Sequence, residues 1–569
     1  MMIAPYILIV SLLAKDMRAV EVGDACQTST FESLLDDNEE IESVDVVEQR
    51  NEYGEGEENV GYPQNPTELP ELCAVTVRVK SSEISSFRFG LFLPTDWNSK
   101  LLTVGNGGFA GGINWLDMGP GTHHGFATAS TDTGHSSNAT DLSWALNNEE
   151  RRRDWGWRAI HGTVDLSKRL VEAYYGEDLG HSYYAGCSTG GRQGLRELQS
   201  FPDSFDGAII GAPAWNPPLL NTYVTRIGTY NLPSDDAKHI PEELLEVIHE
   251  EVLRQCDGLD GVDDGIISAP ELCDVDLEPL SCDREGIDKS RCFTEPQLDT
   301  VRKIYANFYV VDKFVWSGYD PGSELQWSTV ITNDDPSAFG VGFQRYFVND
   351  DPEWSWRSFN NSLFSYAADK NPGESRADKY DLSEFRDRGG KIIMYHGAAD
   401  GLVPTRGSNV YYDRVSDTMG RPPTDFFRYF LVPGMQHCWD TAVDAPWYFA
   451  APFQAGVLGN DTWSVPGFRD SEHDILLALV DWVEEGKPVE SLVATTWTVS
   501  NDSDTDVLRQ RPLCPYPEKA IYHGEGDADQ ASSWHCDTVD LEDGDPMLPP
   551  SAMMAGLWTF VVLSLTLLF

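Results

Sequence analysis

Short hydrophobic runs alternate with segments of helical periodicity over most of the chain. Runs bounded by turn residues predict strands at 75–79, 87–93, 101–104, 183–185, 208–210, 392–395 and 427–432. Apolar residues at helical spacing predict helices over 163–175 and 475–483. Strands that alternate with helices indicate a parallel sheet covered on both faces, so the sequence predicts an α/β fold.

The alternation is lost between residues 214 and 387. This stretch is rich in Asp, Pro and Trp, and it holds four of the ten cysteines. We interpret it as an inserted domain with little regular structure. It divides one sheet domain into residues 73–213 and 388–536.

An acidic segment precedes the first predicted strand. Residues 32–58 carry twelve acidic side chains and one basic side chain. Such a composition favours a solvated, disordered loop, which we expect within an N-terminal segment over residues 20–72.

Both ends of the chain are hydrophobic. Residues 1–14 have the length and composition of a secretory signal, which we place at residues 1–19, although the usual basic residues before the apolar run are lacking. Residues 552–569 form an uncharged run within a spacer and tail over residues 537–569. This arrangement is typical of a GPI-anchor signal, and a short retained membrane helix is the alternative. We therefore expect a secreted protein, or one attached to the extracellular surface through this tail.

The composition of the chain excludes some classes of binding partner and favours a secreted protein. With 41% hydrophobic and 11% aromatic residues the chain can bury a core, and its formal net charge of −51 argues against a nucleic-acid partner. Ten cysteines suit five disulfides in a secreted protein. Acceptor sequences for N-glycosylation begin at Asn138, Asn360, Asn460 and Asn501.

The sharpest motif is GCSTG at residues 186–190, which matches G-x-S-x-G. A predicted strand precedes it and we expect a helix over 192–199 after it, which is the context of a nucleophile elbow. The glycines matter because side chains beside a tight strand-to-helix turn would clash. We therefore predict Ser188 as a catalytic nucleophile, and an ordinary glycine-rich turn is the alternative.

A serine nucleophile needs a base and an acid that orients the base, expected in the order Ser, Asp, His. Asp400 and His437 each follow a predicted strand in the second half of the sheet domain, and we assign them as the acid and the base. Asp413, Asp425 and His396 are rivals, and a structural role suits His396 better.

Two cysteines adjoin this predicted triad. Cys187 precedes Ser188, and Cys438 follows His437. If the hydroxyl and the imidazole are within hydrogen-bond reach, the two sulfurs are close enough to bridge. We therefore expect a Cys187–Cys438 disulfide that holds nucleophile and base together. The alternative is that each cysteine pairs elsewhere.

An oxyanion hole needs two N–H donors. The N–H of Thr189, next to the nucleophile, should be one of them. The second should come from the glycine-rich loop 105–112, and we choose Gly108 because glycine lets backbone approach a ligand closely. A flexible turn is the alternative for this loop.

These motifs resemble those of the tannase and feruloyl esterase family. The resemblance covers residues 73–536 and rests on GCSTGGRQG, DTGH at 132–135, FDGAIIGAPA at 205–214, YHGAADGLVP at 395–404 and RPLCPYP at 511–517. It implies an α/β-hydrolase fold with a large inserted lid domain, the triad Ser188, Asp400 and His437, and a disulfide between the triad's neighbours. Members of the family cleave gallate, ferulate and related aromatic esters.

The resemblance also implies a structural Ca²⁺ site in the lid. Residues 256–266 are rich in the oxygen ligands that Ca²⁺ prefers, although Val262 breaks the pattern of an EF-hand. The ligands carried over are the carboxylates of Asp257, Asp260 and Asp264 and the carbonyl oxygens of Val262 and Ile266. A plain acidic loop is the alternative. The remaining cysteines are then expected to pair as Cys256–Cys273, Cys282–Cys292, Cys26–Cys73 and Cys514–Cys536.

We therefore expect a serine esterase that cleaves small aromatic esters, free or on a plant or algal polymer, through an acyl-enzyme. Trp354, Trp356 and Phe359 are candidates to stack on an aromatic acyl group, although packing in the lid core is the preferred interpretation. Two alternatives stay open. One is an esterase for non-phenolic substrates, and the other is a non-catalytic surface adhesion or binding protein on a hydrolase fold.

Overall fold

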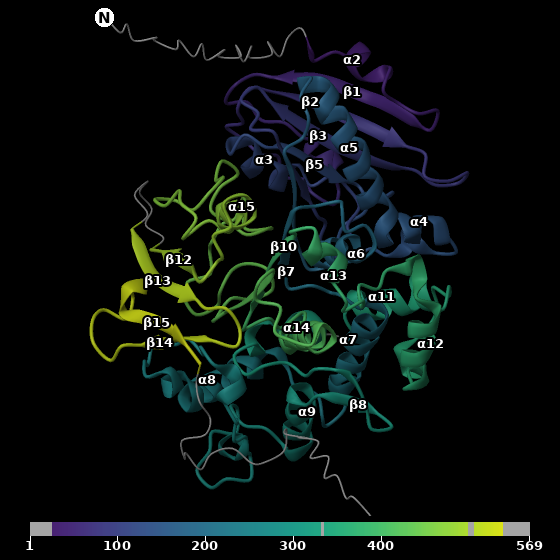
Figure 1. The fold of residues 1–569 in the computed structure, drawn as a ribbon. Coiled ribbons are helices and arrows are strands. Elements are labelled where there is room, and N and C mark those ends of the chain that lie inside the picture. The colour runs from purple at the N-terminus through teal and green to yellow at the C-terminus, as the bar shows by residue number, and fades with distance from the viewer. Residues whose placement is uncertain (1–24, 332–334, 499–505, 539–569) are drawn as a thin grey trace, which may run out of the picture.

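A nine-stranded sheet forms the centre of the molecule (Figure 1). The computed structural model describes residues 25–331, 335–498 and 506–538. The strands lie in the order β1-β2-β3-β5-β4-β6-β7-β10-β11, antiparallel from β1 to β5 and parallel from β5 onward. Their bounds are β1 Glu39–Val47, β2 Leu72–Val79, β3 Phe87–Pro94, β4 Lys100–Val104, β5 Ala127–Thr131, β6 His181–Cys187, β7 Gly207–Gly211, β10 Lys391–Gly397 and β11 Phe427–Val432.

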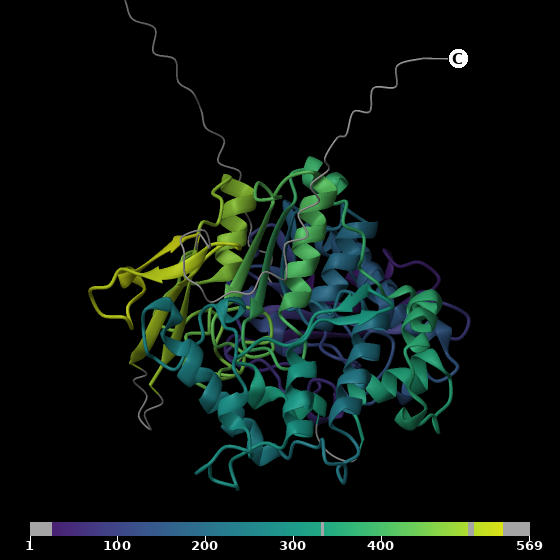
Figure 2. The same ribbon diagram turned by 90° about the horizontal axis from the view of Figure 1, so that it is seen from below.

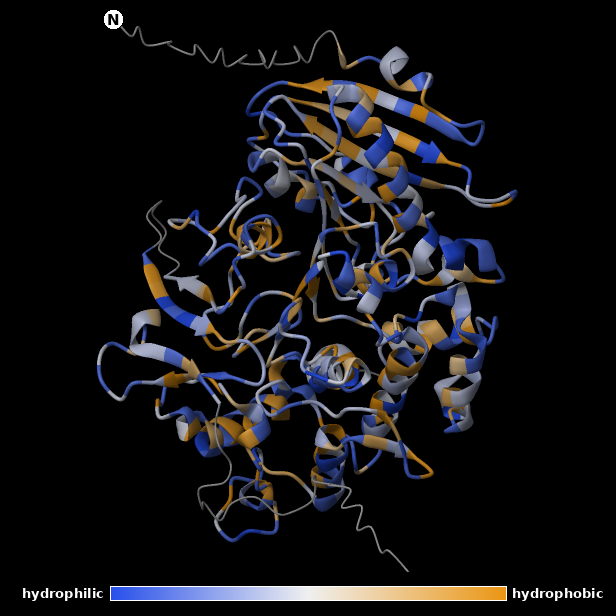
Figure 3. Ribbon diagram, in the orientation of Figure 1, coloured by the Kyte–Doolittle hydropathy of each residue, from blue (hydrophilic) through white to orange (hydrophobic). Residues whose placement is uncertain are grey.

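The parallel strands are buried on both faces. Within β6, Tyr183 packs with residues of α3 and α15, whereas the adjacent Tyr184 packs on the other face with residues of α5, α6 and α14. This follows from the alternation of side chains along a strand. The long helix α15 is largely orange in Figure 3, as expected of a helix that covers a sheet. The bounds are α3 Trp115–His123, α5 Ala159–Tyr175, α6 Thr189–Ser200, α14 Arg406–Met419 and α15 Ile475–Glu485.

Every strand and helix predicted from the hydrophobic pattern is present, most with slightly wider bounds. Strand β5 was not predicted, because its sequence ATAST consists of small residues that give no clear apolar run.

The acidic segment is not the disordered loop that its composition suggested. Residues Glu39–Val47 form β1, which pairs antiparallel with β2 and makes one edge of the sheet. The Glu42 carboxylate accepts hydrogen bonds from Arg78 and Arg88, and Arg88 also donates to Glu55 at 2.7 Å. Charged side chains on an edge strand hinder pairing with other chains, so the acidic composition is compatible with a strand.

The segment between β7 and β10 adds no strand to the central sheet and is more helical than expected. In α7, the buried residues Leu220, Tyr223, Val224 and Ile227 have helical spacing, but the two prolines that open the helix hid this pattern. In Figure 2, teal helices of this segment lie together at the bottom of the view. The bounds are α7 Pro217–Asn231, α8 Leu245–Cys256, α9 Glu295–Tyr305, β8 Phe308–Val310, β9 Lys313–Trp316, α10 Ser328–Ile331, α11 Ala338–Phe343, α12 Ser362–Lys370 and α13 Ser383–Asp387.

All five expected disulfides are present, and they join Cys26–Cys73, Cys187–Cys438, Cys256–Cys273, Cys282–Cys292 and Cys514–Cys536. Five disulfides are typical of a protein made for an oxidising compartment. Smaller elements complete the described chain, namely α2 Thr28–Glu32, α4 Glu149–Arg153, β12 Leu492–Trp497, β13 Val507–Leu513, β14 Lys519–Tyr522 and β15 Trp534–Asp537.

Several predictions about the ends fall outside the described residues. These are the signal segment over residues 1–19, the hydrophobic tail and the sequon at Asn501. Among the described residues, none of the helices combines the length and hydrophobicity needed to cross a bilayer.

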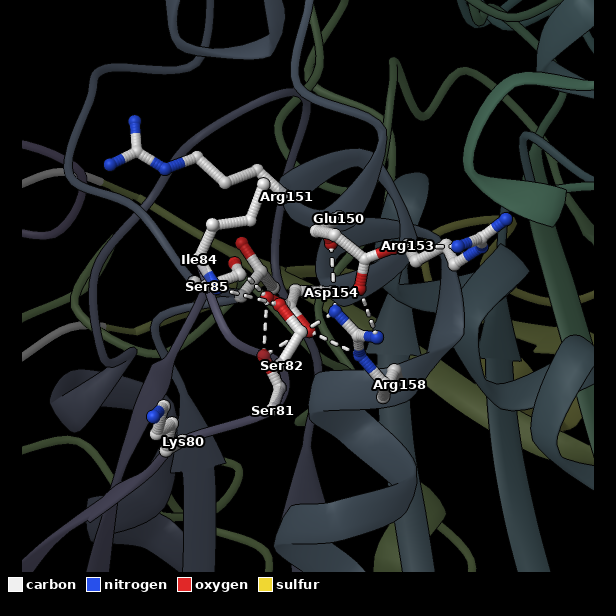
Figure 4. A network of polar contacts seen from close by, with 12 residues as sticks. Lys80, Ser81, Ser82, Ile84, Ser85, Glu150, Arg151, Arg153, Asp154 and Arg158 are labelled. Carbon is white, nitrogen blue, oxygen red and sulfur yellow. Dashed lines mark hydrogen bonds and ion pairs between the residues drawn. The ribbon is translucent and has the colours of Figure 1, made fainter. Parts of the chain in front are cut away.

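A buried carboxylate ties the start of α5 to the loop after β2 (Figure 4). Asp154 is fully buried, and it accepts hydrogen bonds from Ser81 Oγ at 2.9 Å, Ser85 Oγ at 2.5 Å and Arg158 Nε at 2.6 Å. The next residue, Trp155, accepts a hydrogen bond at its carbonyl oxygen from Arg192 of α6, at 3.1 Å. The network therefore also positions α6, the helix that follows Ser188.

Replacing Asp154 by Ala leaves Arg158 and two serine hydroxyls without their buried partner, so we expect the free energy of unfolding to fall by about 3 kcal/mol. Denaturant unfolding measures this. Asp165→Ala is the control, because the Asp165 side chain is 70% exposed and lies 3.9 Å from Arg169. The control should change the free energy by less than about 0.5 kcal/mol. An equally small change for Asp154→Ala would contradict the role given to the network.

Candidate active site

Ser188 lies on the tight turn between β6 and α6. Its φ of 61° is in the left-handed region, which a non-glycine residue rarely adopts. A Cβ on Gly186 would come within 2.8 Å of the Gly190 carbonyl carbon, and a Cβ on Gly190 would lie 3.0 Å from the Asn106 carbonyl oxygen. The turn therefore needs both glycines, as expected for a nucleophile elbow.

Asp400 and His437 meet in the loops that follow β10 and β11. The buried Asp400 Oδ2 lies 2.6 Å from His437 Nδ1. The other carboxylate oxygen, Oδ1, accepts hydrogen bonds from the backbone N–H groups of Leu402 and Val403, both at 2.8 Å. The carboxylate thus orients the imidazole, and the backbone that follows Asp400 in the same loop holds the carboxylate.

His396 supplies a further contact to Asp400 that the sequence did not indicate. Its Nε2 lies 2.9 Å from Asp400 Oδ2, and its Nδ1 lies 2.8 Å from Ser408 Oγ. A neutral imidazole protonated at Nε2 satisfies both contacts, since Nδ1 can then accept the serine proton. His396 is therefore structural, as expected, but it also positions the acid.

The electrostatics of the site favour an ionised Asp400. Burial alone would raise its pKa, but the charge of His437 and the hydrogen bonds from His396 and His437 hold the pKa of this carboxyl well below its usual range. Because Nδ1 of His437 faces the carboxylate, the other nitrogen, Nε2, is left to act on a substrate. Nε2 is buried and makes no hydrogen bond with any described residue.

A covalent bond joins the two halves of the site. The Cys187–Cys438 disulfide spans 251 residues of sequence and holds the two Cα atoms 6.0 Å apart. Ser188 and His437, the neighbours of these cysteines, line one cavity. The Ser188 hydroxyl makes no hydrogen bond to the imidazole in this structure, and such bonds often tighten only when substrate binds.

The cavity beside Ser188 has a volume of about 250 Å³ and an apolar wall. Aromatic and aliphatic side chains of the lid segment form part of this wall, among them Leu220, Val224 and Phe339. Apart from His437, none of the described residues that line it is acidic or basic. The site therefore suits an uncharged, largely apolar group.

The family model described as tannase and feruloyl esterase matches residues 73–342 and 372–537 of this chain. The chain belongs to the tannase and feruloyl esterase family. It is a carboxylic ester hydrolase with an α/β-hydrolase fold, as the resemblance implied.

Relatives of known sequence and structure lie within this family. The probable feruloyl esterase B-1 of Aspergillus flavus is 32% identical over 498 residues, which cover 85% of this chain and 91% of that protein. The crystal structure of feruloyl esterase B from Aspergillus oryzae matches with a TM-score of 0.82 and 30% identity, over 90% of this chain and 99% of that one. Tannin acyl hydrolase from Aspergillus niger shares the fold at 20% identity, with a TM-score of 0.70 and coverage of 91% and 96%.

Two residues that line the cavity with Ser188, Thr189 and Gly108, each have a backbone N–H that donates to no described residue. Thr189 is the first residue of α6, where an N–H has no partner within the helix. In the glycine-rich loop, the N–H groups of Gly107, Phe109 and Ala110 donate to Tyr62 Oη, Ala139 O and Gly107 O, whereas that of Gly108 makes no hydrogen bond with a described residue. Tyr62, which no sequence motif indicated, therefore helps to fix this loop.

The stacking candidates in the lid do not reach the cavity. Trp356 is buried against Leu232 and Val341, with Trp354 packed beside them, and Phe359 packs edge-on against Phe364. The preferred interpretation, packing within the lid, is confirmed. The lid instead contributes Phe339 to the cavity wall.

The acidic loop 256–266 closes on itself through its own carboxylates. Asp257 accepts hydrogen bonds from the N–H groups of Asp264 and Gly265, and Asp264 Oδ2 accepts one from Arg511 at 2.7 Å. Asp260 Oδ2 is buried and has no hydrogen-bond partner among the described residues, and burial raises the pKa of this carboxyl. A buried, unpartnered carboxylate oxygen in an oxygen-rich loop fits a Ca²⁺ ligand.

A second acidic group lies elsewhere. Asp470, Glu472 and His473 form the one set of three potential metal ligands within 4.8 Å of one another in the described part of the chain. No three carboxylates of the acidic loop lie this close together, and both oxygens of Asp257 and both of Asp264 already accept hydrogen bonds.

Replacing Asp400 by Asn keeps the shape of the side chain but removes its charge. The Asn amide can also donate to Nδ1 of His437, and this favours the tautomer that cannot accept a proton at Nε2. We expect kcat to fall about ten-thousandfold. Steady-state hydrolysis of an aromatic ester measures this. Asp425→Asn is the control, because Asp425 is 47% exposed and pairs with Arg421, and it should leave kcat within about twofold. An Asp400→Asn enzyme within tenfold of wild type would exclude Asp400 as the triad acid.

Proposed function

We propose that Ser188, Asp400 and His437 are the catalytic triad of a secreted esterase that cleaves aromatic esters. His437 Nε2 takes the proton of Ser188 Oγ as the oxygen attacks the ester carbonyl, and Asp400 stabilises the imidazolium that forms. The imidazolium then gives its proton to the leaving alcohol. Water, deprotonated by the same nitrogen, hydrolyses the acyl-enzyme and releases the acid.

The backbone N–H groups of Thr189 and Gly108 stabilise the negative charge on the carbonyl oxygen. The support for this assignment is that both residues line the cavity with Ser188 and that neither N–H donates to a described residue. Donors already aimed at the developing charge need no rearrangement during the reaction.

The observation that carries the choice of substrate is the wall of the cavity. Phe109, Trp155 and Phe339 present aromatic surface to the space beside Ser188, and apart from His437 none of the described lining residues could pair with a charged acyl group. Such a wall favours an aromatic acyl group with few hydroxyls, because each buried hydroxyl without a partner costs free energy. Feruloyl groups meet this condition better than galloyl groups, which carry three hydroxyls.

A panel of methyl esters tests this preference. We expect kcat/KM for methyl ferulate to exceed that for methyl gallate by about tenfold or more, since one unpaired hydroxyl alone is worth about 1–3 kcal/mol. An aliphatic methyl ester of similar size should be the poorest substrate. Ser188→Ala protein, which should be inactive on all three, is the control for background hydrolysis. A preference for the aliphatic ester would favour an esterase for non-phenolic substrates.

We also propose a structural Ca²⁺ in the loop 256–266, held by the carboxylates of Asp257, Asp260 and Asp264 and by the carbonyl oxygens of Val262 and Ile266. The support is the buried Asp260 oxygen without a partner and the oxygen-only donor set. The ion would cross-link a loop that also contacts β13 through Arg511. No residue of this loop lines the cavity beside Ser188, so we propose a role in stability; Gly265 nevertheless shares a small cavity with Ala399 and Gln436, the neighbours of Asp400 and His437.

Removing this ion should destabilise the protein. At a Ca²⁺ concentration about a hundred times Kd, binding adds about 2.7 kcal/mol to the free energy of unfolding, and we expect EGTA to remove about that amount. Added Ca²⁺ should restore it. Asp260→Ala protein should no longer respond to EGTA, whereas Glu472→Ala protein, altered in the other acidic group, should respond like wild type. The opposite pattern would assign the ion to that group.

A secreted protein would carry glycans at its accessible acceptor sequences. Asn138 and Asn360 are exposed and Asn460 is half-buried, so we propose them as glycosylation sites, together with Asn501. A cleaved N-terminal signal, and attachment of the C-terminal tail to a membrane as a GPI anchor or a short helix, stay predictions from the sequence.

A further inference from the structure

The DTGH motif at residues 132–135 lies against the glycine-rich loop that carries Gly108, and no step of the proposed reaction uses it. The motif follows β5, and Ser137, two residues beyond it, pairs with Gly111 of the glycine-rich loop as an isolated antiparallel bridge. A Cβ on Gly111 would lie 2.4 Å from Cδ2 of His135, so the imidazole packs directly on the backbone of that loop. The motif is therefore placed to act on the glycine-rich loop.

The backbone of the motif is strained and held in place. Thr133, a β-branched residue, has a φ of 55°, and the next residue, Gly134, has a φ of 85°. Asp132 Oδ1 accepts hydrogen bonds from the N–H groups of Gly134 and Arg88, both at 2.8 Å. A Cβ on Gly134 would come within 2.9 Å of the Cβ of Asp154, the centre of the network in Figure 4. An unfavourable conformation that the surrounding contacts maintain is typical of a functional site.

The imidazole of His135 is buried and has a defined proton. Its Nε2 lies 3.0 Å from the carbonyl oxygen of Phe109, which can only accept, so Nε2 carries the proton. Nδ1 then accepts a hydrogen bond from Thr133 Oγ1 at 3.3 Å. The ring stacks on Trp144 with a centroid distance of 3.7 Å, and burial lowers the pKa of His135 to about 4. His135 is therefore a fixed, neutral donor at neutral pH.

The hydrogen bond from His135 acts on Gly108 through two peptide groups. A peptide group is planar, and in the trans form its C=O and N–H point in opposite directions. His135 holds the C=O of Phe109, and this sets the direction of the Ala110 N–H in the same peptide group. The Ala110 N–H donates to the carbonyl oxygen of Gly107 at 3.1 Å, in the peptide group that carries the Gly108 N–H. The direction of the Gly108 N–H therefore depends on His135.

Two side chains share the carbonyl oxygen of Phe109. Ser137 Oγ donates to it at 3.0 Å, beside Nε2 of His135, so both donors come from the segment that follows β5. Phe109 itself lines the cavity beside Ser188, whereas neither His135 nor Ser137 does. The backbone that adjoins the nucleophile is thus held from behind by groups that do not reach the substrate.

We propose that His135 is a positioning residue of the esterase reaction, because its Nε2 proton holds the Phe109 carbonyl and thereby orients the Gly108 N–H toward the oxyanion of the reacting ester. A donor that is oriented in advance needs no rearrangement as the charge develops. Since His135 does not line the cavity, its loss should affect the transition state more than the binding of the ester. The inference rests on the proposed function, because it uses the assignment of Gly108 to the oxyanion hole.

The first experiment removes the donor and keeps a ring of similar shape. In His135→Phe, kcat for methyl ferulate should fall about thirtyfold, which is less than the hundredfold or more expected when an oxyanion donor is lost outright, and KM should stay within about twofold. His135→Gln keeps an N–H donor at the same reach, so its kcat should return to within about threefold of wild type. Lost packing would not give this rescue, because the Gln side chain cannot replace the ring on Trp144.

A transition-state analogue measures the oxyanion contact directly. Ser188 Oγ adds to the carbonyl carbon of an aryl trifluoromethyl ketone, the serine proton passes to His437, and the carbonyl oxygen becomes an oxyanion. The inhibition constant of this ketone should rise in His135→Phe by about the factor by which kcat/KM falls. The inhibition constant of the corresponding feruloyl amide, which binds without reacting, should not change.

Ser137→Ala removes the other donor to Phe109 and should lower kcat about threefold in the same pattern. His523→Phe is the matched control, because His523 is exposed after β14 and does not line the cavity. It should equal wild type in both measurements.

The inference is overturned by an unchanged kcat in His135→Phe, by a loss that His135→Gln does not restore, or by an unchanged inhibition constant of the ketone. If His135→Phe does not fold, Ser137→Ala decides, and an unchanged inhibition constant of the ketone in that variant overturns the inference. Failure of wild type to cleave methyl ferulate or any other ester of the panel overturns the esterase function instead.

Discussion

The arrangement of the site depends on the Cys187–Cys438 disulfide. Parallel strands place the residues that follow them at one edge of a sheet, but they do not fix the loops that carry those residues. Here the bond joins the residue before the proposed nucleophile to the residue after the proposed base, across 251 residues of sequence. In the chain-entropy account, a disulfide that closes a loop of 251 residues lowers the entropy of the unfolded chain, and this stabilises the folded state by about 5 kcal/mol. Its more specific effect is local, because a cross-link beside both groups limits the displacements that would slow proton transfer.

Local contacts also stabilise Asp400. This buried carboxylate has His437 and His396 at one oxygen and two backbone N–H groups at the other. A buried charge is stable only when it is paired and hydrogen bonded, and these four contacts meet that condition. The acid therefore stays ionised in an apolar site without help from solvent. The protonation state of Asp400 is therefore set by its four neighbours, and not by the overall charge of a chain with 92 acidic residues.

How far the sequence predicts such a site depends on whether the signal is local. Seven of the nine strands of the central sheet, together with Ser188, Asp400, His437 and the disulfide, were predictable, because each is marked by a hydrophobic run or by a motif with a fixed place in the fold. The strand β1 was missed because acidic residues obscured its alternation, and α7 was missed because two prolines at its start look like a helix breaker. His396 as a partner of Asp400, and Tyr62 as a partner of Gly107, could not be predicted. Each contact is made between loops whose meeting depends on the whole fold.

The walls of the cavity beside Ser188 come from two parts of the chain. Leu220, Val224 and Phe339 belong to the lid segment between β7 and β10, whereas Gly108 and His437 belong to loops outside the lid. A change in the lid can therefore alter the shape of the cavity without changing the sheet. The lid is nevertheless coupled to the triad, because Gln326 Oε1 accepts hydrogen bonds from the N–H groups of Gly401 at 2.9 Å and His437 at 3.3 Å. A lid substitution that displaced Gln326 would reach the loops of both the acid and the base.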